Sequence, residues 1–108
     1  MSGNVLIVES HNDLRQVIAE VLTRADYRCD AVAGPADALL KLRSTDYSLI
    51  LVDVDSPSKL EPFLEAVESD PALRSRLVMI TEESVVVSDA RHLQKPFDTR
   101  ALLRAAER

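Results

Sequence analysis

Five polar residues of the kinds that bind phosphate or metal ions stand directly after, or at the end of, short apolar runs. They are Glu9, Ser10, Asp53, Thr81 and Lys95. Two carboxylates about 4 Å apart repel each other by roughly 4 kcal/mol at an effective dielectric constant near 20. A Glu9 side chain beside Asp53 therefore favours a bound cation or a raised pKa. Because Mg²⁺ prefers oxygen ligands, the set predicts a site for Mg²⁺ and a phosphoryl group.

These residue types have distinct tasks in phosphoryl transfer. The Asp53 carboxylate can attack phosphorus in line once a metal ion and the Lys95 ammonium group offset the charge on the transferring oxygens. The hydroxyl of Thr81 can then donate a hydrogen bond to the product phosphate. Taken singly, Glu9 is typical of a helix cap and Lys95 of a surface charge. The functional prediction therefore depends on their combination with Asp53.

The chain alternates apolar runs with stretches of helical spacing. Strands are predicted at 5–8, 27–32, 49–52 and 77–80, with a fifth that Lys95-Pro96 closes. Helices are predicted from Asn12 as N-cap through 22, in a short stretch near 36–40, over 60–67, and after Asp98 as cap. This alternation predicts an α/β fold with a doubly wound, open parallel sheet of five strands. Ligands of such sheets bind at the carboxyl ends of the strands, where the five polar residues stand.

Length and composition predict a single domain with one hydrophobic core. The 108 residues predict a single domain over 1–108. A net charge of -5 without a dense basic run argues against direct nucleic-acid binding. The one cysteine, Cys29, is interpreted as a small buried residue. No stretch approaches the roughly 20 apolar residues of a bilayer span and no signal peptide is recognised, so a cytoplasmic location without membrane contact is expected.

In their order and spacing, these residues resemble the receiver domains of bacterial response regulators over essentially the whole chain. Asp53, with Pro57 four residues later, looks like the phosphoacceptor and its loop, and Thr81 matches the hydroxyl position. The segment Lys95-Pro96-Phe97 looks like the end of the family's fifth strand, where a cis peptide often precedes the proline. The resemblance implies a flavodoxin-like sheet with strand order 2-1-3-4-5.

The resemblance also implies partners and a cofactor. A histidine kinase or phosphotransfer protein would supply the phosphoryl group to Asp53, and the aspartyl phosphate would regulate a downstream protein partner. Mg²⁺ would be held by Glu9, Asp53 and the backbone carbonyl of Asp55. No enzyme activity is expected beyond catalysis of the chain's own phosphoryl transfer, and a homodimer is compatible with the family.

Three positions depart from the family pattern. Ser10 stands where the family has a directly metal-ligating aspartate, which predicts weakened Mg²⁺ binding unless the Asp55 carboxylate partly replaces it. Glu82 follows Thr81 where the family prefers a small residue, and its bulk and charge obstruct phosphodonors. His92 takes the place of the family's switch aromatic and is given no role, whereas His11 is expected to face solvent.

The fourth crossover is short. Only residues 82–94 separate Thr81 from Lys95, and the fifth strand takes several of them, which leaves about nine where a crossover with a helix usually needs at least about 10 to 12. Three consecutive valines at 85–87 are also poor helix formers. We therefore expect the fourth helix to be absent or reduced, and partner contacts on that side to differ from those of the family.

Two other functions compete with the phosphorylated receiver. The first is a pseudo-receiver, which keeps the fold as a phosphorylation-independent protein-binding module; Ser10 and Glu82 favour it. The second is a phosphatase of the haloacid-dehalogenase type, because Asp53-Val54-Asp55 resembles that family's Asp-x-Asp. That family places the motif on its first strand and needs a further acidic pair after the lysine, whereas only Asp98 is available here.

Overall fold

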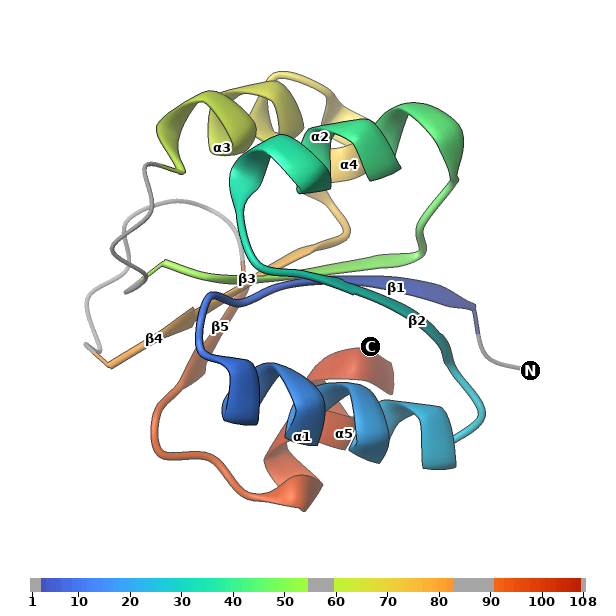
Figure 1. Cartoon of the computed structure of the whole chain (residues 1–108), viewed down its shortest axis with the longest axis vertical. Helices are drawn as coiled ribbons and strands as arrows, with labels where there is room; N and C mark the ends of the chain where they lie inside the picture. Colours follow the sequence, from blue (N-terminus) through green and yellow to red (C-terminus); the bar gives the residue numbers. More distant parts are fainter. Residues whose placement is uncertain (1–2, 55–59, 83–90, 108) are drawn as a thin grey trace.

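The computed structural model describes residues 3–54, 60–82 and 91–107, in which strands and helices alternate (Figure 1). The strands are β1 (Asn4–Val8), β2 (Arg28–Val32), β3 (Leu49–Asp53), β4 (Leu77–Thr81) and β5 (Arg91–Gln94). The helices are α1 (Asn12–Arg24), α2 (Pro35–Ser44), α3 (Glu61–Glu68), α4 (Pro71–Arg74) and α5 (Thr99–Glu107). The predicted alternation of apolar strands and amphipathic helices is confirmed.

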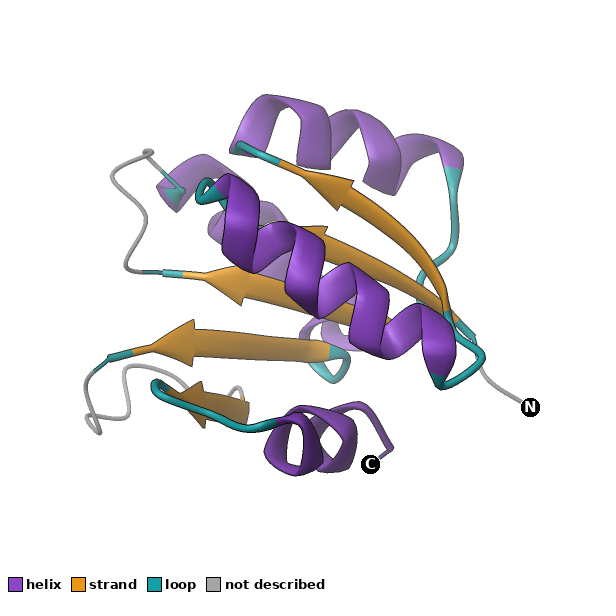
Figure 2. Cartoon of the chain, turned by 60° about the horizontal axis from the view of Figure 1, so that its bottom comes forward, coloured by secondary structure: helices purple, strands orange, loops and turns teal. Residues whose placement is uncertain are grey.

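The five strands form one parallel sheet in the order β2-β1-β3-β4-β5. Figure 2 shows their arrowheads pointing to the same end of the molecule. The chain leaves β1 toward β2 on one side and returns to β3 on the other, which places a topological switch point between β1 and β3. The predicted doubly wound fold and the flavodoxin-like strand order are confirmed.

Helices cover both faces of the sheet. α1 and α5 lie on one face, and α2, α3 and α4 lie on the other (Figure 1). Side chains of a central strand alternate between two cores: Leu6 and Ile50 pack with α2 and α3 residues, whereas Ile7 and Leu51 pack with α1 and α5 residues. Burial on both faces is the physical reason why the central strands read as continuous apolar runs.

Some helix ends differ from the expectation. Asn12 is the first residue of α1 and His11 is the N-cap, so the prediction of Asn12 as cap was wrong by one position. α2 is ten residues long rather than short, because Pro35 starts it with a preset φ and its polar positions face solvent. The predicted cap of α5 is confirmed, since Asp98 Oδ1 accepts a hydrogen bond of 2.8 Å from the Ala101 N–H.

The connections before and after β4 differ from each other. The short helix α4 belongs to the connection between α3 and β4, and Asp70 caps it by accepting from the Ala72 N–H. The predicted loss of a helix between Thr81 and the fifth strand concerns residues 83–90, which lie outside the described residues. The Lys95-Pro96 peptide is cis, as the family resemblance implied. Among the described residues no helix is both long and apolar enough to cross a membrane.

Candidate functional site

The parallel register gathers three polar side chains at the carboxyl edge of the sheet. Asp53 is the last residue of β3 and pairs with Ile80 of β4, while Thr81 ends β4 and pairs with Gln94 of β5. Glu9 follows β1, whose Val8 pairs with Val52. Glu9 and Asp53 are completely buried and Thr81 is 6% exposed. The structure therefore brings the predicted residues together at the switch point, where sheets of this type bind ligands.

An ion pair joins the end of β3 to the end of β5. The Lys95 Nζ atom lies 2.7 Å from Asp53 Oδ2, and the Lys95 side chain is only 16% exposed. The Lys95 backbone N–H donates to the Thr81 carbonyl at 2.8 Å, so the main chain holds the lysine beside β4. A buried ammonium–carboxylate pair leaves a costly unpaired charge when one partner is lost. Lys95 is thus placed to balance negative charge that develops on Asp53.

The two oxygens of the Glu9 carboxylate differ in their hydrogen bonds. Its Oε2 accepts the His11 backbone N–H at 3.0 Å and lies 2.9 Å from the His11 Nδ1 atom. Its Oε1 is buried and has no hydrogen-bond partner among the described residues. Burial raises the pKa of Glu9, the adjoining Asp53 carboxyl raises it further, and the hydrogen bonds from His11 lower it. The burial of two adjoining carboxyl groups therefore favours a proton or a cation at Glu9.

Metal-ligating atoms of Glu9, His11 and Asp53 all lie within 4.8 Å of one another. His11 is exposed, as expected from the sequence, but its ring nitrogen also contacts the buried Glu9 carboxylate. Sequence reasoning missed this contact; the signal was the position of His11 in the turn that directly follows the strand-end acidic residue. The third metal ligand predicted from the sequence, Asp55, lies outside the described residues.

The three positions that depart from the family pattern have different surroundings. Ser10 is half-buried between Glu9 and His11. Glu82 is exposed and lines a surface pocket of about 610 Å³ with Lys95, Phe97 and residues of α1. His92 pairs with Met79 in the sheet, and its Nε2 atom is buried without a partner among the described residues. The pocket gives Lys95 a route to solvent that the Glu82 carboxylate borders.

Comparison with known proteins decides the family. The chain is 30% identical to the response regulator receiver protein CpdR of Brucella abortus (strain 2308), over an alignment that covers 96% of this chain and 93% of the relative. The chain belongs to the response-regulator receiver family. No model of a known protein family matches it. Receiver membership supports a role in two-component signalling and replaces the phosphatase interpretation.

Solved receiver structures agree with the fold. The chemotaxis response regulator CheY4 of Vibrio cholerae superimposes with a TM-score of 0.86 at 25% identity, covering 99% of this chain and 98% of its own. The receiver domain of a sensor histidine kinase from Pseudomonas aeruginosa PAO1 gives a TM-score of 0.84 at 20% identity, covering 99% and 96%. That domain carries a magnesium ion in its active-site cleft.

The donor set of this receiver fits a divalent cation. Two buried carboxyl groups and an imidazole nitrogen converge, and the Glu9 Oε1 atom, which has no hydrogen-bond partner in the described part of the chain, is the kind of acceptor that a cation satisfies. Receivers in general are not enzymes beyond their own phosphoryl chemistry, and they are linked to histidine kinases and downstream proteins. The arrangement can therefore hold a cation beside an aspartate that a lysine already contacts.

Proposed function

We propose that this receiver accepts a phosphoryl group on Asp53 from a histidine kinase or phosphotransfer protein and that the aspartyl phosphate regulates a protein partner. The observation that carries the proposal is the 2.7 Å contact between Lys95 Nζ and the buried Asp53 carboxylate. A carboxylate at a strand end, buried in a low-dielectric environment and paired with a lysine, is poised for chemistry more often than an exposed one. The chain would act as one domain over residues 1–108, in the cytoplasm.

The step that we propose forms one bond and breaks one. An oxygen of Asp53 bonds to phosphorus as the phosphorus–nitrogen bond of a phosphohistidine donor breaks, and the donor imidazole leaves with the electron pair. Lys95 offsets the charge on the transferring oxygens, and the Thr81 hydroxyl, at the end of the neighbouring strand, donates to the product phosphate. A divalent ion, when bound, neutralises charge on the same oxygens.

In this proposal Glu9, Asp53 and the Asp55 backbone carbonyl hold Mg²⁺. Glu9 and Asp53 have the burial and proximity that the role needs. Ser10 replaces the second acidic ligand of the family, so Mg²⁺ is expected to bind weakly. This weakness is what favours the second candidate function, a pseudo-receiver that binds its protein partner without phosphate.

Amide NMR separates the two candidates. The spectrum of the whole chain is recorded alone, with Mg²⁺, and with Mg²⁺ plus beryllofluoride, which mimics an aspartyl phosphate. We expect shifts centred on Glu9, Asp53, Thr81 and Lys95 that Asp53→Asn abolishes. If beryllofluoride moves no resonance at millimolar Mg²⁺, the phosphorylated receiver is rejected and the pseudo-receiver takes its place.

Incubation with a small phosphodonor such as acetyl phosphate gives a second readout of the same proposal. The expected product is a chain heavier by one phosphoryl group, stable in acid and cleaved by hydroxylamine, as an acyl phosphate is. Asp53→Asn is the control, because it keeps the shape of the side chain and removes the attacking charge. Label retained in Asp53→Asn would place the phosphate elsewhere and overturn the assignment.

A further inference from the structure

We propose that His11 is a metal ligand of this receiver and that the site accordingly prefers a divalent transition ion of the Zn²⁺ and Co²⁺ class to Mg²⁺. The inference deepens the proposed function, on whose site it rests, by naming the class of cation that the site selects. It starts from the three converging groups of Glu9, His11 and Asp53, whose ligating atoms lie within 4.8 Å of one another.

The turn after β1 places the His11 ring at the site. Glu9 Oε2 accepts the His11 backbone N–H at 3.0 Å and approaches its Nδ1 atom at 2.9 Å, so both the main chain and the ring of residue 11 are held against one buried carboxylate. Arg15 fastens the turn to α1, since its Nη1 donates to the Glu9 carbonyl at 2.9 Å and its Nη2 to the Asn12 side chain. The imidazole is therefore preorganised beside Glu9.

Charge and hydrogen bonding leave room for a cation here. The Lys95 ammonium group contacts Asp53 Oδ2, and the Glu9 Oε1 atom accepts no hydrogen bond among the described residues. Ligand atoms about 2.0–2.2 Å from one ion lie at most about twice that distance apart, so the cluster needs only a small contraction to share an ion. The His11 side chain is 61% exposed, which keeps a path open for the ion and its waters.

The donor types decide which cation is favoured. Mg²⁺ demands a near-octahedral set of oxygen ligands, and Ser10 removes the carboxylate that would complete it. Imidazole suits Zn²⁺, Ni²⁺ and Co²⁺, and affinity for mixed nitrogen and oxygen sites rises along the first transition row. An ion would replace the contact between His11 Nδ1 and Glu9 Oε2: Nδ1 of a neutral His11 presents its lone pair to the ion, and the ring proton resides on Nε2 of this 61% exposed side chain. His11 thus changes the preference of a site that Ser10 weakens for Mg²⁺.

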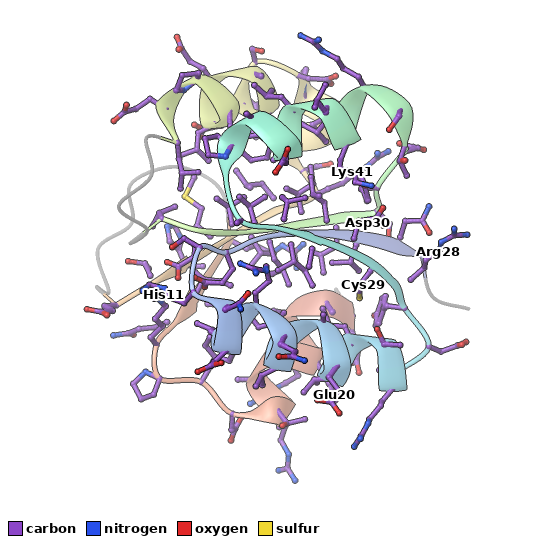
Figure 3. The ribbon with its side chains drawn as sticks, viewed as in Figure 1. His11, Glu20, Arg28, Cys29, Asp30 and Lys41 are labelled. Carbon is purple, nitrogen blue, oxygen red and sulfur yellow. The ribbon has the colours of Figure 1, made fainter. Side chains whose placement is uncertain are left out.

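The rest of the chain supplies matched controls. The chain has two histidines and one cysteine, so His92 and Cys29 are the other imidazole and thiol side chains. Figure 3 shows Cys29 on β2 toward the end of the sheet opposite to His11. His92 lies within β5, with its Nε2 atom buried. Neither residue is part of the cluster of Glu9, His11 and Asp53.

The test is calorimetric titration of the whole chain with Zn²⁺ and, separately, with Mg²⁺, for the wild type, His11→Gln, His92→Gln and Cys29→Ser. We expect Zn²⁺ to bind at least about tenfold more tightly than Mg²⁺. Loss of a residue that only orients a metal ligand lowers metal affinity by about 10–100-fold. Because His11 is proposed to contact the ion directly, His11→Gln should lower Zn²⁺ affinity by at least about tenfold. Its Mg²⁺ affinity, and the Zn²⁺ affinity of both control variants, should stay within about threefold of the wild type.

Imidazole ¹⁵N NMR on the unmodified chain keeps the test independent of any variant's folding. Zn²⁺ should move the Nδ1 resonance of His11 and leave His92 in place. Zn²⁺ binding that shifts only His92, or equal affinities for Zn²⁺ in the wild type and His11→Gln, would overturn the inference.

The two proposals fail separately. Mg²⁺ and beryllofluoride shifts at Asp53 without a Zn²⁺ effect on His11 would reject the ligand role and keep the phosphorylated receiver. Conversely, Zn²⁺ held by His11 in a chain that forms no acyl phosphate would support the ligand role and reject phosphorylation of Asp53.

Discussion

Individual side chains determine how the negative charge of the buried carboxyl groups in this site is compensated. Lys95 contacts one oxygen of Asp53, whereas one oxygen of Glu9 has no hydrogen-bond partner among the described residues. Ser10 sits between Glu9 and His11 with a hydroxyl in place of a carboxylate. The proposed weakness of Mg²⁺ binding therefore rests on one position, which a single substitution can test.

Ser10→Asp should raise the affinity for Mg²⁺ on the order of tenfold, because it adds a charged oxygen ligand beside Glu9 and Asp53. Part of the attraction is offset by repulsion among three carboxylates, so the same variant should unfold more easily when metal is chelated. Calorimetric titration with Mg²⁺ measures the first effect and urea unfolding the second. Ser10→Asn, similar in shape and uncharged, is the control; equal Mg²⁺ affinities of the two variants would show that charge at position 10 does not govern binding.

At the scale of the elements, a hydrogen bond from a loop residue holds the edge strand β2. The Tyr47 hydroxyl, in the connection between α2 and β3, donates to Asp30 Oδ2 at 2.6 Å, and Tyr47 is 1% exposed. Burial raises the pKa of Tyr47 to about 12, and the hydrogen bond to Asp30 contributes to the rise. Because the folded chain holds this proton more tightly, the bond's contribution to stability is complete below the ordinary value of 10.0 and is lost as pH rises toward about 12.

Tyr47→Phe should accordingly lower the free energy of unfolding by about 1.5–3 kcal/mol at neutral pH, since it removes a hydrogen bond to a carboxylate acceptor. The difference in the free energy of unfolding between wild type and variant should become smaller as pH approaches 12. Urea unfolding at several pH values measures this difference. In addition, the phenolate absorbance of the wild type minus that of the variant should titrate near pH 12. Tyr27→Phe is the matched control; a gap that stays constant to pH 12 would contradict the assignment.

At the scale of the whole molecule, the protonation of Glu9 affects the stability of the fold. The pKa of Glu9 is raised above 4.5, chiefly by burial, so the folded chain prefers the protonated side chain. The corresponding contribution to stability is present below pH 4.5 and is lost as pH rises through the folded value. A cation that binds the folded chain reverses the loss, by about 1.4 kcal/mol at roughly ten times its dissociation constant.

Glu9→Gln should therefore make the chain more stable than the wild type at neutral pH in the presence of a chelator, and should remove the stabilisation by divalent ions. Thermal unfolding with chelator and with a divalent ion, at acidic and neutral pH, measures both effects. Glu20→Gln, an exposed substitution on α1, controls for net charge. A Glu9→Gln chain that melts below the wild type in chelator at neutral pH would show that the carboxylate supports the fold without a cation.

The amino-acid sequence by itself determined the architecture and most of the site. Runs such as 49–52 are continuous because their strand is buried on both faces, and a parallel sheet brings the residues that end such runs to one edge. Asp53, Thr81 and Lys95 could therefore be placed from their positions alone. The family followed from the same order of residues, which the likeness to CpdR confirmed.

Only the tertiary structure decided how these groups are paired. The contact of Lys95 with Asp53 spans 42 residues of sequence, and the unbonded oxygen of Glu9 depends on every neighbour that packs around it. His11 is exposed, as the sequence predicted, but its contact with Glu9 could not be predicted, because exposure is a property of a whole side chain whereas a contact depends on one atom and its direction. Strand periodicity predicts which face of the sheet a residue occupies, whereas the distances within the cluster of Glu9, His11 and Asp53 arise only when the turns and strand ends are packed together.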